Sequence, residues 1–340
     1  MPTDRATDKG FEARLDALRE EAGRTGAVRD RGIAIAGGPI PPAATAPVAY
    51  YGQPIVKPPV WTWQIGLYFF VGGTAGMSGL LALAGLITGQ PVAFVRAALA
   101  VAFTGAVISP ALLIADLGRP ARFFNMLRVF KWRSAMSMGV WTLVAFSGFA
   151  TAALLLALAR PLLTRAGLSP TASGALLFIV VAGTAAFGAV LATYTGVLLG
   201  ATAVPVWSSH HRLLPFHFGV VALGSASAIL ELLGFHMAAM QGIGLTVASI
   251  ETGVGAWLEI TRGEVEARAL AHGESGFLMR AAGLCTGPAT LVLRAVGWTE
   301  VAAVCFLLGA VLSRYGWLHA GRVSARDPEE TLAAQRVDRQ

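Results

Sequence analysis

Charged residues are scarce in this sequence of 340 residues, and their scarcity excludes an ordinary soluble domain for most of the chain. Asp, Glu, Lys and Arg together make up 13% of the residues, whereas soluble domains carry about 25%. Hydrophobic residues make up 55%, and the mean hydropathy is +0.63. The composition therefore predicts that most of the chain lies in lipid.

Cysteine and histidine are also scarce, which argues against several kinds of metal or redox centre. The two cysteines, Cys285 and Cys305, lie in or beside apolar stretches and form no CxxC pair. We therefore expect no disulfide framework, zinc site or iron–sulfur cluster in this chain. A bis-histidine haem needs two ligands at matching depth on facing helices. His217 and His236 are predicted at opposite membrane faces, and His217 and His319 near helix ends, so no haem and no other metal is expected.

Long apolar runs dominate what is present. Each has roughly 20 residues or more, the length that a helix needs to cross the hydrocarbon core. The sequence predicts an all-α membrane protein with about eight transmembrane helices in two packed four-helix bundles. An even number of spans puts both termini on one side. The predicted spans are 61–88, 92–115, 134–159, 172–200, 213–233, 236–260, 277–296 and 299–319.

Three regions are expected along the chain. Residues 1–57 form an N-terminal tail, with a short amphipathic helix over 11–24 followed by a Gly- and Pro-rich linker. Residues 58–320 form the transmembrane domain, and residues 321–340 form a polar C-terminal tail. No signal peptide is visible, because the first long apolar run begins only at Trp61.

The positive charges are distributed unevenly between the two sides of the predicted membrane domain. Of the 26 Lys and Arg residues, 22 fall on the side of the termini and four on the other side, namely Arg96, Arg160, Arg165 and Arg294. Positive loops stay in the cytoplasm, so the termini are predicted to be cytoplasmic and the protein to lie in the inner (plasma) membrane. The net charge of +7 is assigned to loops at an anionic membrane face and not to nucleic-acid binding.

The most specific motif lies where the second predicted helix leaves the membrane. Residues 116–123 read DLGRPARF, in which Gly118 and Pro120 stop the helix. Asp116 and Arg119 are three residues apart, close enough to form an ion pair. Two interpretations remain open, a structural ion pair at the membrane interface and a functional site.

Several other motifs accompany it. The first helix combines interfacial aromatics with four glycines (Gly72, Gly73, Gly76 and Gly79), a pattern suited to close helix packing. Helix 3 begins with a Ser- and Met-rich segment at 134–138, and helix 4 ends in YTG at 194–196. A Pro-x-Trp loop follows at 205–207, and helix 5 opens with LPFHF at 214–218.

In this order the motifs resemble the NrfD/PsrC family, the integral membrane subunits of polysulfide reductase-like molybdoenzymes. The resemblance covers about residues 50–260, and the helix count extends it to about 320. It implies a subunit of anaerobic respiration without redox centres of its own, which binds a membrane quinone (menaquinone or ubiquinone). It also implies a docked [4Fe-4S] ferredoxin-like subunit and, through it, a molybdenum- or tungsten-type catalytic subunit.

A quinone site needs an apolar cleft, polar groups for the two carbonyl oxygens and a route for protons. Polar residues at the helix ends on the side of the termini are the candidates. Tyr194 is expected to donate to a quinone oxygen and His217 to relay protons, although an interfacial tyrosine or a solvated histidine has the same pattern. The candidate quinone-binding residues are Gln64, Tyr68, Asp116, Arg119, Tyr194 and His217.

Three carboxylates fall within predicted membrane helices. Glu231 ends helix 5, Glu251 lies in the middle of helix 6, and Glu259 lies near the end of that helix. Ionisable groups at membrane depth are costly and are functional candidates by default. We predict a role in proton transfer, with a buried neutral acid bonded to a neighbouring helix as the alternative.

Two other functions stay open. A secondary transporter usually contains inverted repeats and helices broken at mid-membrane, and Pro110 and Pro288 give that hypothesis slight support. A purely structural membrane anchor differs from the quinone hypothesis only in lacking a quinone pocket.

Overall fold

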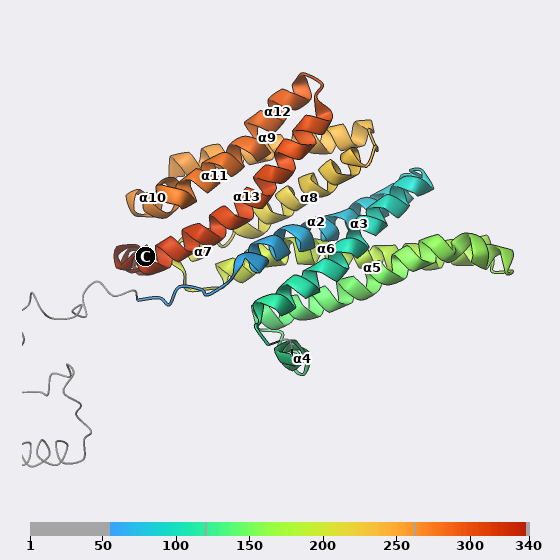
Figure 1. The fold of residues 1–340 in the computed structure, drawn as a ribbon, viewed down its shortest axis with the longest axis horizontal. Coiled ribbons are helices and arrows are strands. Elements are labelled where there is room, and N and C mark those ends of the chain that lie inside the picture. Colours follow the sequence, from blue (N-terminus) through green and yellow to red (C-terminus); the bar gives the residue numbers. More distant parts are fainter. Residues whose placement is uncertain (1–54, 120, 262, 338–340) are drawn as a thin grey trace, which may run out of the picture. The chain divides into compact units, whose positions relative to one another are not determined.

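The computed structural model describes residues 55–119, 121–261 and 263–337, and within these residues the structure is helical without strands (Figure 1). Eight helical segments are long and apolar enough to cross a membrane. They are α2 (Trp63–Ile87), α3 (Val92–Asp116), α5 (Ala135–Arg165), α6 (Pro170–Gly200), α8 (Leu213–Leu232), α9 (Ala238–Thr261), α11 (Gly273–Thr286) with α12 (Pro288–Ala295), and α13 (Thr299–Arg326). Shorter helices are α4 (Ala121–Leu127), α7 (Pro205–Ser209), α10 (Glu264–Ala271) and α14 (Pro328–Val337).

The predicted all-α membrane fold with eight spans is confirmed. Some ends differ, because α5 continues to Arg165 and α13 to Arg326, beyond the apolar runs that marked them. The seventh span is two helices, α11 and α12, which meet at Gly287 and Pro288. The helix predicted over 11–24 lies outside the described residues.

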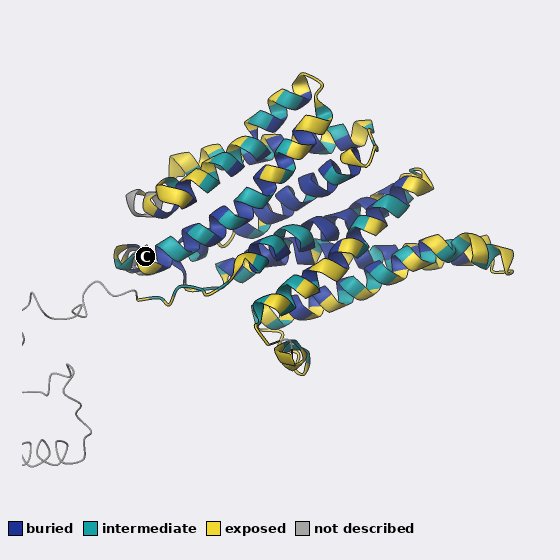
Figure 2. Ribbon diagram, in the orientation of Figure 1, coloured by how far each residue is buried: buried dark blue, intermediate teal, exposed yellow. Residues whose placement is uncertain are grey.

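Neighbouring spans pack in two groups. Helices α2, α3, α5 and α6 pack on one another, as do α8, α9, α11, α12 and α13. The contacts of α2 and α6 with α8 are as extensive as those of α9 and α13 with α8, and α2 also contacts α13, so the two groups are continuous. The division into two four-helix bundles stays a prediction. In the most apolar part of each span, α2, α8 and α13 are 61%, 67% and 56% buried, more than any other span. These three helices therefore form the centre of the transmembrane domain (Figure 2).

Small residues allow α2, α6 and α8 to pack closely, as the glycine pattern of the first helix predicted. A side chain at Gly76 on α2 would collide with the backbone of Gly188 on α6, and the reverse is also true. A side chain at Gly196, the glycine of the YTG motif, would collide with the backbone of Leu214 and Pro215 at the start of α8. Such close approach is a general means of helix association in lipid, where the helices gain little from the hydrophobic effect.

Two prolines inside helices leave carbonyl groups without their usual partner, and side chains of neighbouring helices supply one. A proline lacks the N–H that would bond to the carbonyl four residues earlier. Ser147 donates to the carbonyl of Ala106, four residues before Pro110, at 3.1 Å. Arg96 donates to the carbonyl of Ala157, four residues before Pro161, at 3.1 and 3.3 Å. Both helices therefore continue through their prolines without exposing a free carbonyl to lipid.

The start of α2 meets the C-terminal half of α13, so both ends of the described domain lie on one side. The Trp61 and Trp207 rings are stacked with centroids 5.5 Å apart. The Trp207 indole is fully buried and donates to the carbonyl of Trp317 at 2.8 Å. The Tyr315 hydroxyl donates to the carbonyl of Trp63 at 2.9 Å. The tryptophan of the Pro-x-Trp loop thus has a structural role at this end.

Candidate functional site

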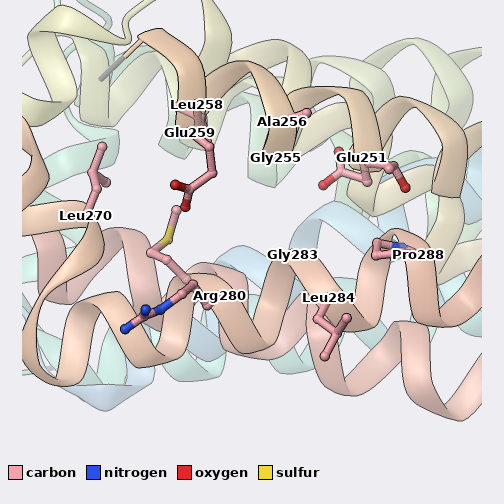
Figure 3. A pocket seen from close by; sticks show the side chains of 12 residues that line it. Glu251, Gly255, Ala256, Leu258, Glu259, Leu270, Arg280, Gly283, Leu284 and Pro288 are labelled. Atoms are coloured by element: carbon pink, nitrogen blue, oxygen red, sulfur yellow. The ribbon is translucent and has the colours of Figure 1, made fainter. Parts of the chain in front are cut away.

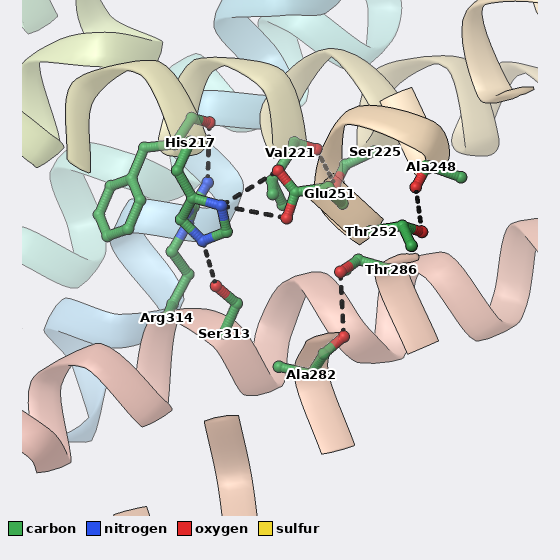
Figure 4. A network of polar contacts seen from close by, with 11 residues as sticks. His217, Val221, Ser225, Ala248, Glu251, Thr252, Ala282, Thr286, Ser313 and Arg314 are labelled. Carbon is green, nitrogen blue, oxygen red and sulfur yellow. Dashed lines mark hydrogen bonds and ion pairs between the residues drawn. The ribbon is translucent and has the colours of Figure 1, made fainter. Parts of the chain in front are cut away.

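A histidine and a glutamate from adjacent helices are hydrogen-bonded in the interior of the membrane domain. His217 lies in the second turn of α8, and its Nδ1 is 3.1 and 3.0 Å from the two carboxylate oxygens of Glu251 on α9. Its Nε2 is 2.9 Å from the hydroxyl oxygen of Ser313 on α13. All three side chains are buried. The imidazole therefore links three helices (Figure 4).

An arginine completes this polar cluster. Arg314 follows Ser313 on α13 and is 1% exposed. It donates to the carbonyl of Phe218 at 2.9 Å, and its guanidinium carbon lies 3.8 Å from the centre of the Phe218 ring. Glu251 is within electrostatic range of the guanidinium. Within the described residues, Nε and Nη1 of Arg314 have no hydrogen-bond partner.

The arrangement can hold and transfer one proton. A buried charge is costly unless it is paired, and here the Glu251 carboxylate has both an imidazole and a guanidinium nearby. When Nδ1 of His217 carries the proton, it donates to Glu251 and Nε2 accepts from Ser313. When the imidazole is protonated on both nitrogens, it donates to both partners. Histidine is the side chain that makes this change most easily near neutral pH.

Two adjoining cavities reach this cluster from the side of α9, α11 and α12. The smaller, about 40 Å³, is lined by His217, Glu251, Ser313 and Trp317. The larger, about 280 Å³, extends from Glu251 to Glu259 and Arg280 (Figure 3). Glu251 lines both, so its carboxylate lies where a polar interior cluster meets a cavity.

The break between α11 and α12 lies beside the larger cavity. Pro288 lines the cavity, and a side chain at Gly287 would collide with the Thr252 hydroxyl on α9. Irregular backbone at membrane depth is tolerated where it is buried in protein or lines a cavity. Gly287 therefore permits the close approach of the broken helix to α9.

Asp116 joins the end of α3 to the start of α2. Its carboxylate accepts hydrogen bonds from the backbone N–H of Thr62, at 3.0 Å, and from the Thr62 hydroxyl, which also contacts Gln64. A negative charge at the N-terminus of α2 is favourable for the helix dipole. No ion pair between Asp116 and Arg119 occurs in the described part of the chain. Gly118 has a φ of +65°, which turns the chain between them and leaves Arg119 exposed.

Tyr68 and Tyr194 form a second buried polar group, on α2 and α6. They are 3% and 8% exposed, and no described residue hydrogen-bonds to either hydroxyl. The two phenols are within electrostatic range of each other. The Tyr194 ring lies against Gly139, where a side chain would overlap it.

Two hydroxyls near these phenols also lack a partner among the described residues. Ser109 Oγ is buried and without a hydrogen bond, and it approaches Gly72 on the same side as the Tyr68 ring. Thr195, next to Tyr194, likewise has a buried hydroxyl without a partner. Buried polar groups are usually hydrogen-bonded, so these two buried hydroxyls, with the two phenols on the same helices or beside them, suit a polar ligand.

Glu231 forms a buried ion pair with Arg294. The two guanidinium nitrogens of Arg294, on α12, lie 2.8 and 2.6 Å from the two carboxylate oxygens of Glu231, at the end of α8. Gln241 on α9 accepts a further hydrogen bond from Arg294 at 2.7 Å. Arg294 is buried, whereas the sequence predicted it among the loop charges of the side opposite the termini. The sequence did contain a signal for this burial, because Glu231 is an acidic residue at matching depth in another span.

The predicted site residues do not form one cluster but lie in several separate places in the structure. Gln64 and Asp116 meet at Thr62, Tyr68 and Tyr194 lie near each other, and His217 pairs with Glu251 instead. Among the predicted acids, Glu231 pairs with Arg294, whereas Glu259 is exposed and lines the larger cavity. Sequence reasoning missed Ser313 and Arg314, although an arginine inside the apolar run 299–319 could have indicated them.

A comparison with protein families gives one match. The family model described as polysulphide reductase, NrfD matches residues 53–313, well over half of the chain. No curated protein matches the sequence. The matched range includes the DLGRP and YTG motifs and His217, Glu251 and Ser313, and it ends one residue before Arg314. The chain therefore belongs to the polysulphide reductase NrfD family.

Proposed function

We propose that this protein is the quinone-binding membrane subunit of a multi-subunit oxidoreductase in the plasma membrane. It passes electrons between the quinone pool and a docked [4Fe-4S] subunit, which connects to a molybdenum- or tungsten-type catalytic subunit. The family membership carries this proposal, and a membrane domain of eight spans is consistent with it.

The proposed quinone site lies at the unpartnered hydroxyls between α2, α3 and α6. The hydroxyls of Ser109 and Thr195 are buried without a partner among the described residues. Ser109 lies on the same side of Gly72 as the Tyr68 ring, and Thr195 follows Tyr194 in the chain. A buried tyrosine hydroxyl usually finds a partner. A quinone carbonyl oxygen is an acceptor of the required kind. In this proposal Tyr194 donates to one carbonyl and fixes the orientation of the ring.

The His217 cluster is the proposed proton route. Each two-electron reduction of a quinone takes up two protons, and these must cross the apolar interior to reach it. His217 and Glu251 hold a proton between them, Ser313 extends the hydrogen bonds, and Arg314 stabilises the ionised carboxylate. Glu259, at the far end of the larger cavity, is a suitable entry point. Ring contacts from Tyr68 through Phe69 and Phe218 to His217 make the two proposed sites neighbours, although the phenylalanine rings themselves cannot transfer a proton.

Purification of the intact complex tests the proposal. The tagged protein is extracted in a mild detergent, the bound proteins are identified by mass spectrometry, and the bound quinone is extracted and quantified. We expect a co-purifying [4Fe-4S] subunit and about one quinone per chain. The proposal is contradicted if the membranes have quinone-linked activity but the chain purifies from them without a [4Fe-4S] subunit and without quinone.

A secondary transporter is the second candidate, and the broken helix beside the larger cavity favours it. Discontinuous helices near the midplane form the ion and substrate sites of many transporters. Reconstituted vesicles separate the two functions. A transporter accumulates its substrate without any partner subunit, whereas the proposed subunit oxidises or reduces quinone only with its partners present.

A further inference from the structure

A third cavity lies at the opposite end of the membrane domain from the termini, in the first group of helices. Its volume is about 270 Å³, and it lies between the end of α2, the start of α3, the end of α5 and the start of α6. One part of its lining is apolar, with Leu86, Val95 and Pro161. The other part contains the side chains of Arg96 and Arg160. The cavity is therefore amphipathic and lies at helix ends, where the headgroup layer meets the hydrocarbon.

The two arginines are positioned by backbone carbonyls and not by acids. Arg96 donates to the Ala157 carbonyl, which Pro161 leaves without its helical partner. Arg160 donates to the Pro170 carbonyl and to the Ser173 hydroxyl, at 3.4 and 3.3 Å. These bonds occupy only part of the five N–H donors that each guanidinium carries. The remaining N–H groups of each guanidinium can therefore donate hydrogen bonds to a ligand in the cavity.

No Asp or Glu is among the residues that line this cavity, and Glu231, at the same end of the domain, is already bound by Arg294. Residues 58–230 contain a single acidic residue, Asp116, and it lies at the other end of α3, where it binds Thr62. Neither Arg96 nor Arg160 forms an ion pair within the described residues. Two half-buried guanidinium groups at one cavity therefore favour an anionic ligand.

We propose that this cavity binds an anionic phospholipid of the leaflet opposite the termini. The phosphate of the headgroup accepts hydrogen bonds from Arg96 and Arg160, since guanidinium groups match phosphate oxygens well. One acyl chain packs along the apolar lining. Basic pockets between transmembrane helices are suited to such headgroups. The inference does not depend on the quinone proposal, because the cavity lies apart from Tyr194 and His217.

Lipid binding to the purified full-length protein tests this assignment. Native mass spectrometry measures the affinities for phosphatidylglycerol and phosphatidylcholine with identical acyl chains. The wild type should prefer phosphatidylglycerol. The double variant R96Q/R160Q should lose about 25-fold in that affinity, because each basic side chain contributes about fivefold, or ~1 kcal/mol. Its affinity for phosphatidylcholine, whose phosphate charge is balanced by the choline cation, should fall much less, so the preference for phosphatidylglycerol should be lost.

Arg165 offers a matched control, because it is exposed, belongs to the same end of α5 and does not line the cavity. R165Q should keep the preference for phosphatidylglycerol. If R96Q/R160Q fails to fold, T164W decides instead, since tryptophan at this lining position fills the cavity and keeps both arginines. Equal phosphatidylglycerol affinity in wild type and R96Q/R160Q, or in wild type and T164W, overturns the proposal. So does displacement of the lipid by millimolar inorganic phosphate or by a quinone analogue.

Discussion

His217 and Glu251 are hydrogen-bonded across α8 and α9, with Nδ1 of the imidazole 3.0 and 3.1 Å from the two carboxylate oxygens. Both residues were candidates from the sequence, but for separate roles and on separate helices. Their contact makes them one hydrogen-bonded unit, to which Ser313 also belongs, and we propose that this unit transfers protons. The cavity that reaches Glu251 gives this unit an approach from outside the helix core.

Glu251→Gln should lower quinone-linked turnover while the protein still folds. Glutamine keeps the shape and most hydrogen-bonding capacity of glutamate but cannot give up a proton. Loss of a proton-transferring group typically lowers a rate by on the order of 10²-fold. Turnover is measured with a soluble quinone analogue in membranes that contain equal amounts of the complex.

Glu300→Gln is the matched control for this experiment. Glu300 is exposed at the start of α13, where it lies 3.7 Å from His236, so the same chemical change there should leave turnover unchanged. Wild-type turnover of Glu251→Gln at every pH from 5 to 9 would show that the proton takes another route.

Removing one partner of the ion pair between Glu231 and Arg294 should destabilise the protein more than removing both partners. Removing one partner of a buried ion pair leaves an uncompensated charge and costs about 3–5 kcal/mol. We therefore expect Arg294→Met to lower the thermal unfolding midpoint strongly. The double variant E231L/R294M removes both charges and should recover much of that loss. A double variant less stable than both single variants would contradict this account.

The fold was predictable from the sequence because lipid imposes a simple rule. Each span must be apolar for about 20 residues, so α2, α3 and α6 and the start of α5 were located within a few residues. The ends were less certain, since α5 and α13 continue as helices into polar sequence. The hydropathy pattern predicts where a segment leaves the lipid. It does not predict where the helix ends, because a helix can continue into polar sequence.

The site was predictable only in part. The sequence indicated which residues were unusual for a membrane, among them Tyr194, His217 and Glu251, but it contained no information on which of them meet. Depth along a helix follows from counting residues, whereas the direction of a side chain depends on how that helix packs. His217 faces α9 and α13, so its partners came from the last third of the chain, where the family motifs were weakest.

Reporter fusions at the C-terminus should show that the termini are cytoplasmic. The prediction depends on the excess of Lys and Arg on the side of the termini. Burial of Arg294 and of Arg314 removes one charge from each side, so the excess remains. A fluorescent protein fused after Gln340 should fluoresce, and an alkaline phosphatase fused there should be inactive. An active phosphatase with a dark fluorescent fusion would reverse the orientation.

Gly139→Ala should disturb the proposed quinone site through the position of Tyr194. The added methyl group would overlap the Tyr194 ring, so the ring must move from its place between α5 and α6. Quinone affinity should fall, while Gly148→Ala on the same helix, where the added methyl group meets open space, should leave it unchanged. Equal quinone affinity in both variants would show that the packing of Tyr194 against Gly139 does not affect quinone binding.

Tyr194→Phe tests the quinone site most directly, because it deletes one hydroxyl with almost no change in volume. The lost hydrogen bond should cost about 0.5–1.5 kcal/mol, which corresponds to about 2- to 13-fold in quinone affinity. Turnover should fall further if the bond strengthens as charge develops on the quinone oxygen. Activity with an artificial soluble electron acceptor should survive, since the catalytic partner is unchanged.

Tyr315→Phe provides the control for the loss of a phenol hydroxyl. The Tyr315 hydroxyl already donates to the Trp63 carbonyl, so its removal should affect the stability of the contact between α2 and α13 and leave quinone affinity unchanged. Equal quinone affinity and turnover in wild type and Tyr194→Phe would place the quinone elsewhere. The cavity beside Glu251 would then be the next site to test, because it is the larger of the two that reach a buried ionisable cluster.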